Sequence, residues 1–225
     1  SLLNEALAAG IGAQAEKVLA GQRLSREDGL ALYACKNIHL VGGLANFVRE
    51  RMHGDHAFFN VNQHINYTNI CNKLCRFCAF QRLPGQEGAY VMSPEEVGDK
   101  IREQLHEPVT EVHMVAGVYP KLSYQYYLDI LRAVKDARPD IHIKAFTMIE
   151  LMQIAVRAKK PLKEVLPELI EAGLGSCPGG GAEVFADRVH LEGYHLKNTG
   201  DEWIETARTV HEAGLNSNAT MLHGH

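Results

Sequence analysis

Short apolar segments alternate with amphipathic helical segments from about residue 57 onward, and this alternation most limits the possible fold. The predicted strands span residues 57–62, 111–116, 141–146, 174–177 and 215–221. At least one predicted helix separates each strand from the next, which predicts a parallel sheet wound in one hand. Because the crossovers are long and the strands recur, we expect an α/β fold of the TIM-type (β/α) barrel kind.

The residues before the first strand have a different pattern. Leu and Ala recur at helical spacing in residues 2–20 and 25–51, and Ser25 with Asp28 resembles a capping box. We therefore expect an N-terminal helical segment over residues 1–55 and a barrel over residues 56–225. The chain stops directly after the fifth predicted strand, so we expect only the first five β/α units of a longer barrel, truncated at its C-terminal end.

Three of the five cysteines lie close together in a predicted loop after the first strand. Cys71, Cys75 and Cys78 have the spacing C-x3-C-x2-C. Thiolates at this spacing suit the corners of an iron–sulfur cluster, and three of them leave one of four irons open to a substrate. The alternative is a zinc site completed by a histidine such as His64. Cys177 could be a fourth ligand, but we favour a buried packing role for it.

The cysteine spacing, with Phe77 directly before the last cysteine, resembles the signature of the radical S-adenosylmethionine (SAM) enzymes. Residues 66–80 look more specifically like the branch that makes menaquinone through futalosine and the deazaflavin chromophore. The resemblance implies a [4Fe-4S] cluster held by Cys71, Cys75 and Cys78, whose open iron binds the amino and carboxylate groups of SAM. It also implies that the reduced cluster cleaves SAM to a 5′-deoxyadenosyl radical.

The glycine-rich stretch 178–183 resembles a segment of the same branch, and it follows the fourth predicted strand. Parallel β/α folds place their active sites at these strand ends. The resemblance makes Glu183 a candidate for hydrogen bonds to the SAM ribose hydroxyls, and Arg188 a candidate for the SAM carboxylate. The alternative for both residues is a solvated surface pair.

Three further residues are candidates for binding SAM. Gly117 resembles a family glycine whose backbone lets the SAM amino group approach closely. Phe77 could shield the cluster or border the adenine, and its alternative is simple loop packing. Asn218 belongs to a set of polar residues that alternate along the last predicted strand and so share one face, where adenine or substrate would supply hydrogen-bond partners.

Residues 115–122, 143–150 and 173–185 look most like the aminodeoxyfutalosine synthases within this branch. The resemblance implies that the adenosyl radical adds to the vinyl ether carbon of 3-[(1-carboxyvinyl)oxy]benzoate, followed by rearrangement and loss of the carboxyl carbon. Dehypoxanthine futalosine cyclase and deazaflavin (FO) synthase are the alternatives within the family. A noncatalytic zinc-binding interaction protein is the alternative from another class.

The expected substrate is an aryl vinyl ether that carries two carboxylates, so its site needs cationic or amide donors. Arg82, Lys144 and His225 are the candidates, and Arg82 and His225 are also the only candidate catalytic residues. The resemblance further implies an electron donor such as flavodoxin or ferredoxin.

Composition fits a globular enzyme. The chain has 46% hydrophobic and 22% charged residues, and its formal net charge of −4 gives no basic footprint for nucleic acid. No apolar run approaches the roughly 20 residues of a membrane span. An odd number of cysteines, most of them packed together, fits a reducing compartment. We therefore expect a cytoplasmic protein that binds neither nucleic acid nor membrane.

Overall fold

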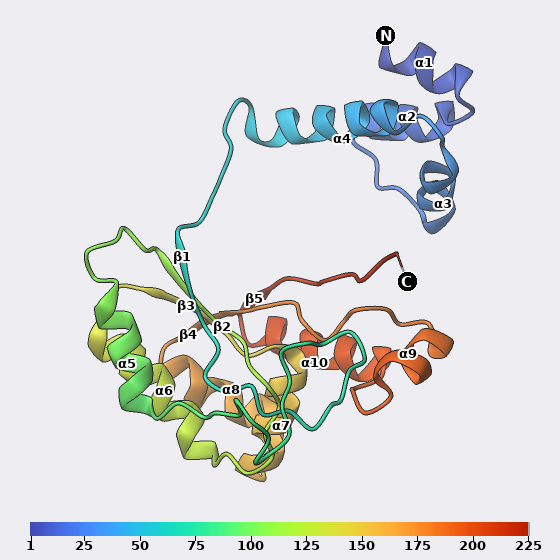
Figure 1. Cartoon of the computed structure of the whole chain (residues 1–225). Coiled ribbons are helices and arrows are strands. Elements are labelled where there is room, and N and C mark those ends of the chain that lie inside the picture. Colours follow the sequence, from blue (N-terminus) through green and yellow to red (C-terminus); the bar gives the residue numbers. More distant parts are fainter. Residues whose placement is uncertain (225) are drawn as a thin grey trace. The chain divides into compact units, whose positions relative to one another are not determined.

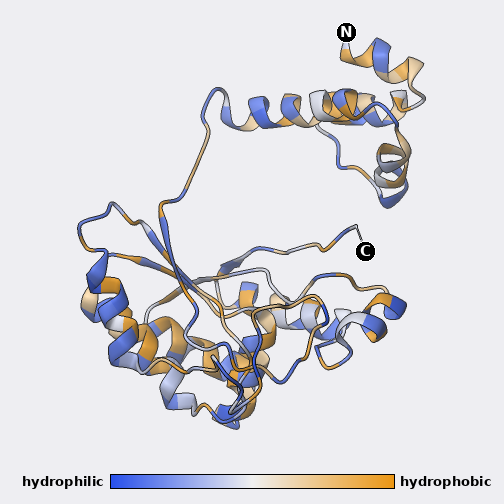
Figure 2. Ribbon diagram, in the orientation of Figure 1, coloured by the Kyte–Doolittle hydropathy of each residue, from blue (hydrophilic) through white to orange (hydrophobic). Residues whose placement is uncertain are grey.

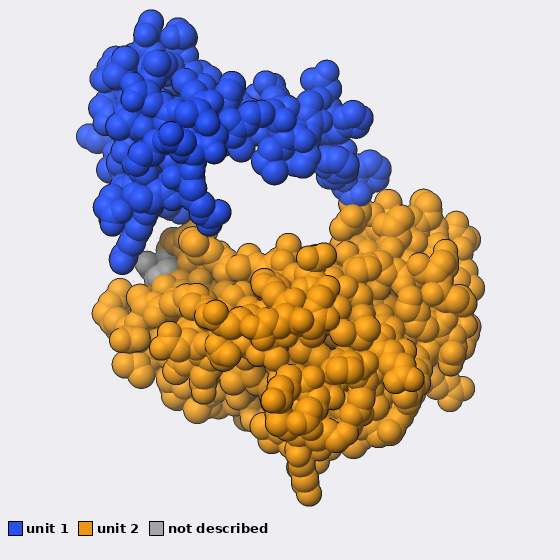
Figure 3. All heavy atoms as spheres, turned by 180° about the vertical axis from the view of Figure 1, so that it is seen from behind, with its two compact units in different colours: residues 1–59 blue, residues 60–225 orange. Residues whose placement is uncertain are grey.

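The computed structural model describes residues 1–224, and the chain divides into two compact units. The first unit is Ser1–Phe59 and the second is Asn60–His225, coloured separately in Figure 3. No helix within residues 1–224 is long and apolar enough to cross a membrane.

The first unit is helical. Its helices are α1 (Leu2–Ala8), α2 (Gly12–Leu19), α3 (Arg26–Ala34) and α4 (Ile38–His53). They enclose a small core to which Ile11, Val18, Leu40 and Leu44 contribute. The capping box predicted for Ser25 and Asp28 is present at the start of α3.

The second unit is built on a parallel sheet. Its strands are β1 (Asn62–Ile65), β2 (Glu111–Met114), β3 (His142–Ala145), β4 (Leu174–Cys177) and β5 (Asn216–Ser217). Their order in the sheet is the order of the chain, and every neighbouring pair is parallel. This topology confirms the predicted α/β class and the arrangement of consecutive β/α units (Figure 1).

Helices connect the strands of the second unit. They are α5 (Pro94–Glu103), α6 (Tyr124–Ala137), α7 (Met148–Ala158), α8 (Leu162–Glu171), α9 (Asp187–Tyr194) and α10 (Gly200–Glu212). The side-chain oxygens of Ser93, Ser123, Thr147 and Thr199 cap α5, α6, α7 and α10. Helix α9 has no side-chain cap and was not predicted.

The core lies between the sheet and these helices. Along each strand, alternate residues such as Val112, Met114, Ile143 and Ala145 are fully buried against the helices. Figure 2 shows hydrophobic and hydrophilic residues interspersed along α5 and α6, as expected for helices with one buried face. The intervening strand residues point to the opposite face of the sheet.

The prediction for the first strand was wrong. Residues 57–61 lie outside the sheet, and Phe58 and Phe59 are 80% and 86% exposed. Strand β1 instead begins at Asn62, where pairing with Glu111 on β2 sets its register. Long-range pairing, rather than local apolar content, therefore decides which residues form this strand. Its one polar side chain on the helix side, Gln63, donates to the Lys100 carbonyl at 2.6 Å.

Candidate functional site

The cysteine loop, residues 71–78, follows β1 and is held by backbone hydrogen bonds to distant segments. The Asn72 amide donates to the Val118 carbonyl, just after β2, at 3.1 Å. The Arg76 amide donates to the Gly193 carbonyl in α9 at 2.9 Å. The loop is therefore fixed between the end of a strand and a helix that lies more than a hundred residues later in the chain.

Cys71, Cys75 and Cys78 are free thiols, and all three are partly exposed. Burial raises the pKa of Cys75, and the neighbouring Cys71 and Cys78 act in the same direction, whereas the charge of Lys197 opposes them. Within residues 1–224 no three His, Cys, Asp or Glu side chains are placed to hold a single metal ion. Three soft thiols on one short loop fit the corners of an iron–sulfur cluster, whose ligands bind different irons and need not converge on one point.

Lys197 connects the cysteine loop to the glycine-rich segment. Its Nζ lies 2.9 Å from Oε1 of Glu183, and the two side chains are only 11% and 15% exposed. The same Nζ lies 5.6 Å from the ring centroid of Phe77, which packs edge-on against Tyr194. The structure thus brings together two predicted site residues, Phe77 and Glu183. Lys197 carries no local sequence signal and was missed.

Two glycines allow backbone segments to pass closely at the strand ends. A Cβ on Gly117 would lie 2.3 Å from the Ile70 carbonyl oxygen, directly before the cysteine loop. A Cβ on Gly179 would lie 2.6 Å from the backbone of Asn218, whose amide donates to the Cys177 carbonyl. Gly117 therefore has a packing requirement of its own.

The Glu150 carboxyl group forms hydrogen bonds to the segments that follow three strands. Its Oε1 accepts from the Tyr67 hydroxyl at 2.6 Å and from the Ala116 amide at 3.1 Å. Its Oε2 accepts from the Thr147 amide at 2.8 Å and from the Thr147 hydroxyl at 2.6 Å. The residue is 3% exposed, and burial raises the pKa of its carboxyl. Tyr67, Ala116 and Thr147 follow β1, β2 and β3, so one carboxyl group fixes all three.

The other predicted site residues are placed differently. Nη1 of Arg82 donates to the carbonyl oxygens of Ala79 and Gln81 at 3.0 and 2.9 Å, so the guanidinium holds its own loop. The Arg188 side chain is 76% exposed and pairs with Glu192 on α9. His225 lies outside the described residues. Cys177 is fully buried, and burial raises the pKa of its thiol to about 12.

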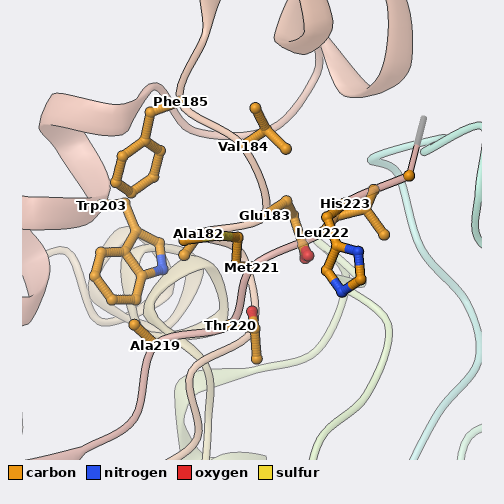
Figure 4. Close-up of a pocket in the computed structure, with 11 residues that line it drawn as sticks. Ala182, Glu183, Val184, Phe185, Trp203, Ala219, Thr220, Met221, Leu222 and His223 are labelled. Carbon is orange, nitrogen blue, oxygen red and sulfur yellow. The ribbon is translucent and has the colours of Figure 1, made fainter. Parts of the chain in front are cut away.

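A cavity of about 400 Å³ lies beside the glycine-rich segment. Figure 4 shows Trp203 and Phe185 on one side of it and Leu222 and His223 on the other. The indole Nε1 of Trp203 donates to the Gly180 carbonyl at 3.2 Å, which fixes the tryptophan against this segment. A mostly apolar hollow with a carboxylate, Glu183, at its wall has the size of a small-molecule pocket.

Known proteins resemble the chain in sequence. The family model described as the Radical SAM superfamily matches residues 65–225. The chain is 46% identical over 211 residues to an aminodeoxyfutalosine synthase of Thermus thermophilus, covering 94% of this chain and 57% of that protein. It is 38% identical over 210 residues to a cyclic dehypoxanthine futalosine synthase of Halalkalibacterium halodurans, covering 93% and 57%. The chain thus spans little more than half the length of these curated relatives.

Solved structures share the fold. A methylornithine synthase matches with a TM-score of 0.70 at 16% identity, covering 94% of this chain and 59% of that chain. The FeFe-hydrogenase maturase HydG from Carboxydothermus hydrogenoformans matches with a TM-score of 0.70 at 19% identity, covering 99% and 51%. At such identities the likeness concerns the fold alone. The family model, which matches well over half of the residues, shows that the chain belongs to the radical SAM superfamily of enzymes.

Proposed function

We propose that this chain forms the radical-generating part of an aminodeoxyfutalosine synthase. The 5′-deoxyadenosyl radical of SAM adds to the vinyl ether carbon of 3-[(1-carboxyvinyl)oxy]benzoate. The adduct radical attacks the aryl ring, rearranges and loses its carboxyl group as carbon dioxide, and the radical then gives up one electron, equal to the one spent in cleaving SAM, to leave the closed-shell product. The observation that carries the proposal is the identity of 46% and 42% to two enzymes of this name over more than nine-tenths of the chain.

In this proposal Cys71, Cys75 and Cys78 hold a [4Fe-4S] cluster. When bound, the cluster supplies the electron that splits SAM into methionine and the adenosyl radical. The three thiols must lose their protons to bind, so loading releases protons. The Lys197 ammonium favours the thiolate of Cys75 and thereby opposes the effect of burial. A small electron-transfer protein such as flavodoxin or ferredoxin is the proposed donor.

Glu183 is the proposed partner of the SAM ribose hydroxyls. Its Oε1 accepts hydrogen bonds from Lys197 and from the Gly181 amide, so the carboxylate is already oriented before SAM binds. The backbone at Gly117 and the side chains of Phe77 and Asn218 complete the proposed SAM contacts. Arg188 is left out because its exposed guanidinium pairs with Glu192.

Positioning is the main demand that this reaction makes of the protein. A primary alkyl radical abstracts hydrogen from almost any nearby group, so the alkene must lie close to the 5′ carbon while water and mobile side chains are excluded. The carboxyl group of Glu150 meets this demand by fixing the segments after three strands.

Anaerobic reconstitution with iron and sulfide, followed by product analysis with SAM and the vinyl ether, tests the proposal. The wild-type protein should turn brown and form an adenosyl adduct of the substrate. Cys75→Ala should lose both properties, whereas Cys35→Ala, a matched change at the end of α3, should keep both. Free 5′-deoxyadenosine as the main adenosyl product would contradict the addition mechanism.

The second candidate is a cyclic dehypoxanthine futalosine synthase, supported by 38% identity to such an enzyme. In that reaction the radical abstracts hydrogen from the substrate and leaves as 5′-deoxyadenosine, so the same product analysis separates the two candidates. A colourless protein that loads zinc and no iron would contradict both and favour the zinc-binding alternative.

A further inference from the structure

One side chain from each strand forms a polar row across the sheet face opposite the helices. The row consists of His64, His113, Lys144, Ser176 and Asn216, and each is in register with the next. Their neighbours along the strands, such as Val112 and Ile143, are fully buried against the helices. The two faces of the sheet therefore differ sharply: one is a packed core and the other presents hydrogen-bonding groups.

His113 and Lys144, in the middle of the polar row, are partly exposed. Neither residue takes part in an ion pair within residues 1–224. Burial lowers the pKa of His113, as does the charge of Lys144, while Glu111 opposes them. The imidazole of His113 is therefore neutral near pH 7 and can donate one N–H, while Lys144 brings the positive charge.

Asn66 fixes the hydrogen-bonding role of His64. Its Nδ2 lies 2.6 Å from the Val115 carbonyl oxygen, which can only accept, and 3.0 Å from Nε2 of His64. The amide thus presents N–H groups to both, so Nε2 of His64 is an acceptor and the ring proton sits on Nδ1. The ring centroids of His64 and His113 are 5.2 Å apart, which places the two imidazoles side by side.

We propose that His64, His113 and Lys144 bind the aryl carboxylate of the substrate, an inference that rests on the proposed function. One ammonium and two neutral N–H donors match a group with one negative charge and two acceptor oxygens. Every member of the polar row is the next-to-last residue of its strand, so the row lies roughly 3 Å below the strand ends. A carboxylate bound there leaves the remainder of the substrate pointing toward the cysteine loop.

The proposed site uses residues of the first three strands. In the next strand, the Ser176 hydroxyl lies 2.7 Å from Nε2 of His142 and so already has one hydrogen-bond partner. Glu111, two residues before His113 on β2, is 8% exposed and is the acidic group nearest in sequence to the proposed site. Its carboxylate disfavours a second anion at that end of the strands, so the site takes one carboxylate in a single orientation.

The test compares Lys144→Met with Lys163→Met, a matched change on the exposed side of α8. Calorimetric titration of the cluster-loaded protein with 3-[(1-carboxyvinyl)oxy]benzoate, without reductant, measures substrate binding directly. We expect Lys144→Met to weaken binding about 10- to 100-fold, the usual effect of losing a charged hydrogen bond, and Lys144→Arg to retain part of it. Lys163→Met should bind as the wild type does, and the KM for SAM should not change in any variant.

A substrate analogue with a carboxamide in place of the aryl carboxylate tests the same contact in the wild-type protein, whose folding is not in question. The wild-type protein should lose affinity for this analogue, and Lys144→Met should show no further loss. If the wild type forms the adenosyl adduct while Lys144→Met binds the carboxylate equally well, the inference is overturned and the proposed function stands. If the wild type cleaves SAM but neither binds nor converts the vinyl ether, the proposed function is overturned and the inference with it.

Discussion

Two buried carboxyl groups, Asp28 in the first unit and Glu150 in the second, occupy the same local motif in different electrostatic surroundings. Each is the third residue of a helix and completes a capping box, with Ser25 in one case and Thr147 in the other. Each also accepts hydrogen bonds from groups outside its own helix. The difference between them lies in the charge of those groups.

Asp28 has a cation beside it. Nζ of Lys17 lies 2.6 Å from its Oδ2, and Nε2 of Gln14 donates to Oδ1 at 3.1 Å. The hydrogen bond from Lys17 is the main reason why the pKa of Asp28 is far below its usual value. Glu150 receives hydrogen bonds from neutral groups alone, and burial raises its pKa in spite of them.

The comparison shows that a capping box does not fix the role of its acid. Asp28 joins α3 to the nearby α2 and so stabilises a small helical unit. Glu150 accepts hydrogen bonds from Ala116 and Tyr67, which are 34 and 83 positions away in the chain. It therefore fixes the strand ends around the candidate site.

Glu150→Ala should lower the free energy of unfolding of the second unit by about 3–5 kcal/mol, because it leaves several buried donors without an acceptor. Urea unfolding followed by fluorescence of Trp203, the only tryptophan in the chain, measures this loss. Glu164→Ala, at the third position of α8 but exposed and without a capping hydrogen bond, is the matched control. Equal losses in the two variants would contradict the role of Glu150.

Tyr67→Phe should cost about 1–2 kcal/mol in the same measurement, because it removes one hydrogen bond to Glu150 and keeps the ring. The ring packs edge-on against Tyr127 and Phe146, and these contacts should persist. In a Glu150→Ala background the same change should cost much less. An unchanged cost in that background would show that Tyr67 stabilises the fold independently of Glu150.

Asp28→Asn should lower the stability of the first unit by less than Tyr67→Phe lowers that of the second. The substitution keeps the size of the side chain but removes the charge that pairs with Lys17, whose own side chain is 39% exposed. Residue-resolved hydrogen exchange on α3 measures the loss, and Lys17→Met should produce a similar one. Faster hydrogen exchange of the α7 amides in either variant would show that the two carboxyl groups do not act separately.

The smallest effects should appear in the pH dependence, and they should have opposite signs. The folded-state pKa of Asp28 lies below its ordinary value of 3.8, so its contribution to stability is present above that pH and is lost as the pH falls. The folded-state pKa of Glu150 lies above its ordinary value of 4.5, so stability falls as the pH rises from 4.5 through the folded value.

Protection factors of α3 and α7, measured between about pH 3 and pH 6, should therefore change in opposite directions. Asp28→Asn and Glu150→Gln should each remove the corresponding change. Parallel changes in the two helices would show that other groups dominate.

Much of the fold was predictable because its signals are local. Ser93, Ser123, Thr147 and Thr199 mark helix starts by a hydrogen bond that spans three residues. Strand β1 was misplaced because its boundaries depend on pairing with β2, almost fifty residues later. Helix α9 was missed because Tyr194 is its only buried residue, so its sequence has no apolar periodicity.

In the candidate site, too, local signals were predictable from the sequence and long-range contacts were not. The spacing of Cys71, Cys75 and Cys78 is a local pattern, so the sequence alone indicates their chemistry. Lys197 and Tyr67 gain their importance only from partners brought close by folding, Glu183 for one and Glu150 for the other. Arg82 looked available from the sequence, and only the structure reveals that it binds the carbonyl groups of its own loop.

The order of the strands in the sheet has a consequence for how the protein is made. Because β1 to β5 follow one another in the sheet as they do in the chain, each strand pairs with the one that left the ribosome just before it. Each new strand therefore meets a partner edge that is already formed, and no pairing in the described sheet must wait for a later segment. Synthesis from the N-terminus thus delivers the loop of Cys71 to Cys78 early, and the segments that fix it, after β2 and in α9, are added later.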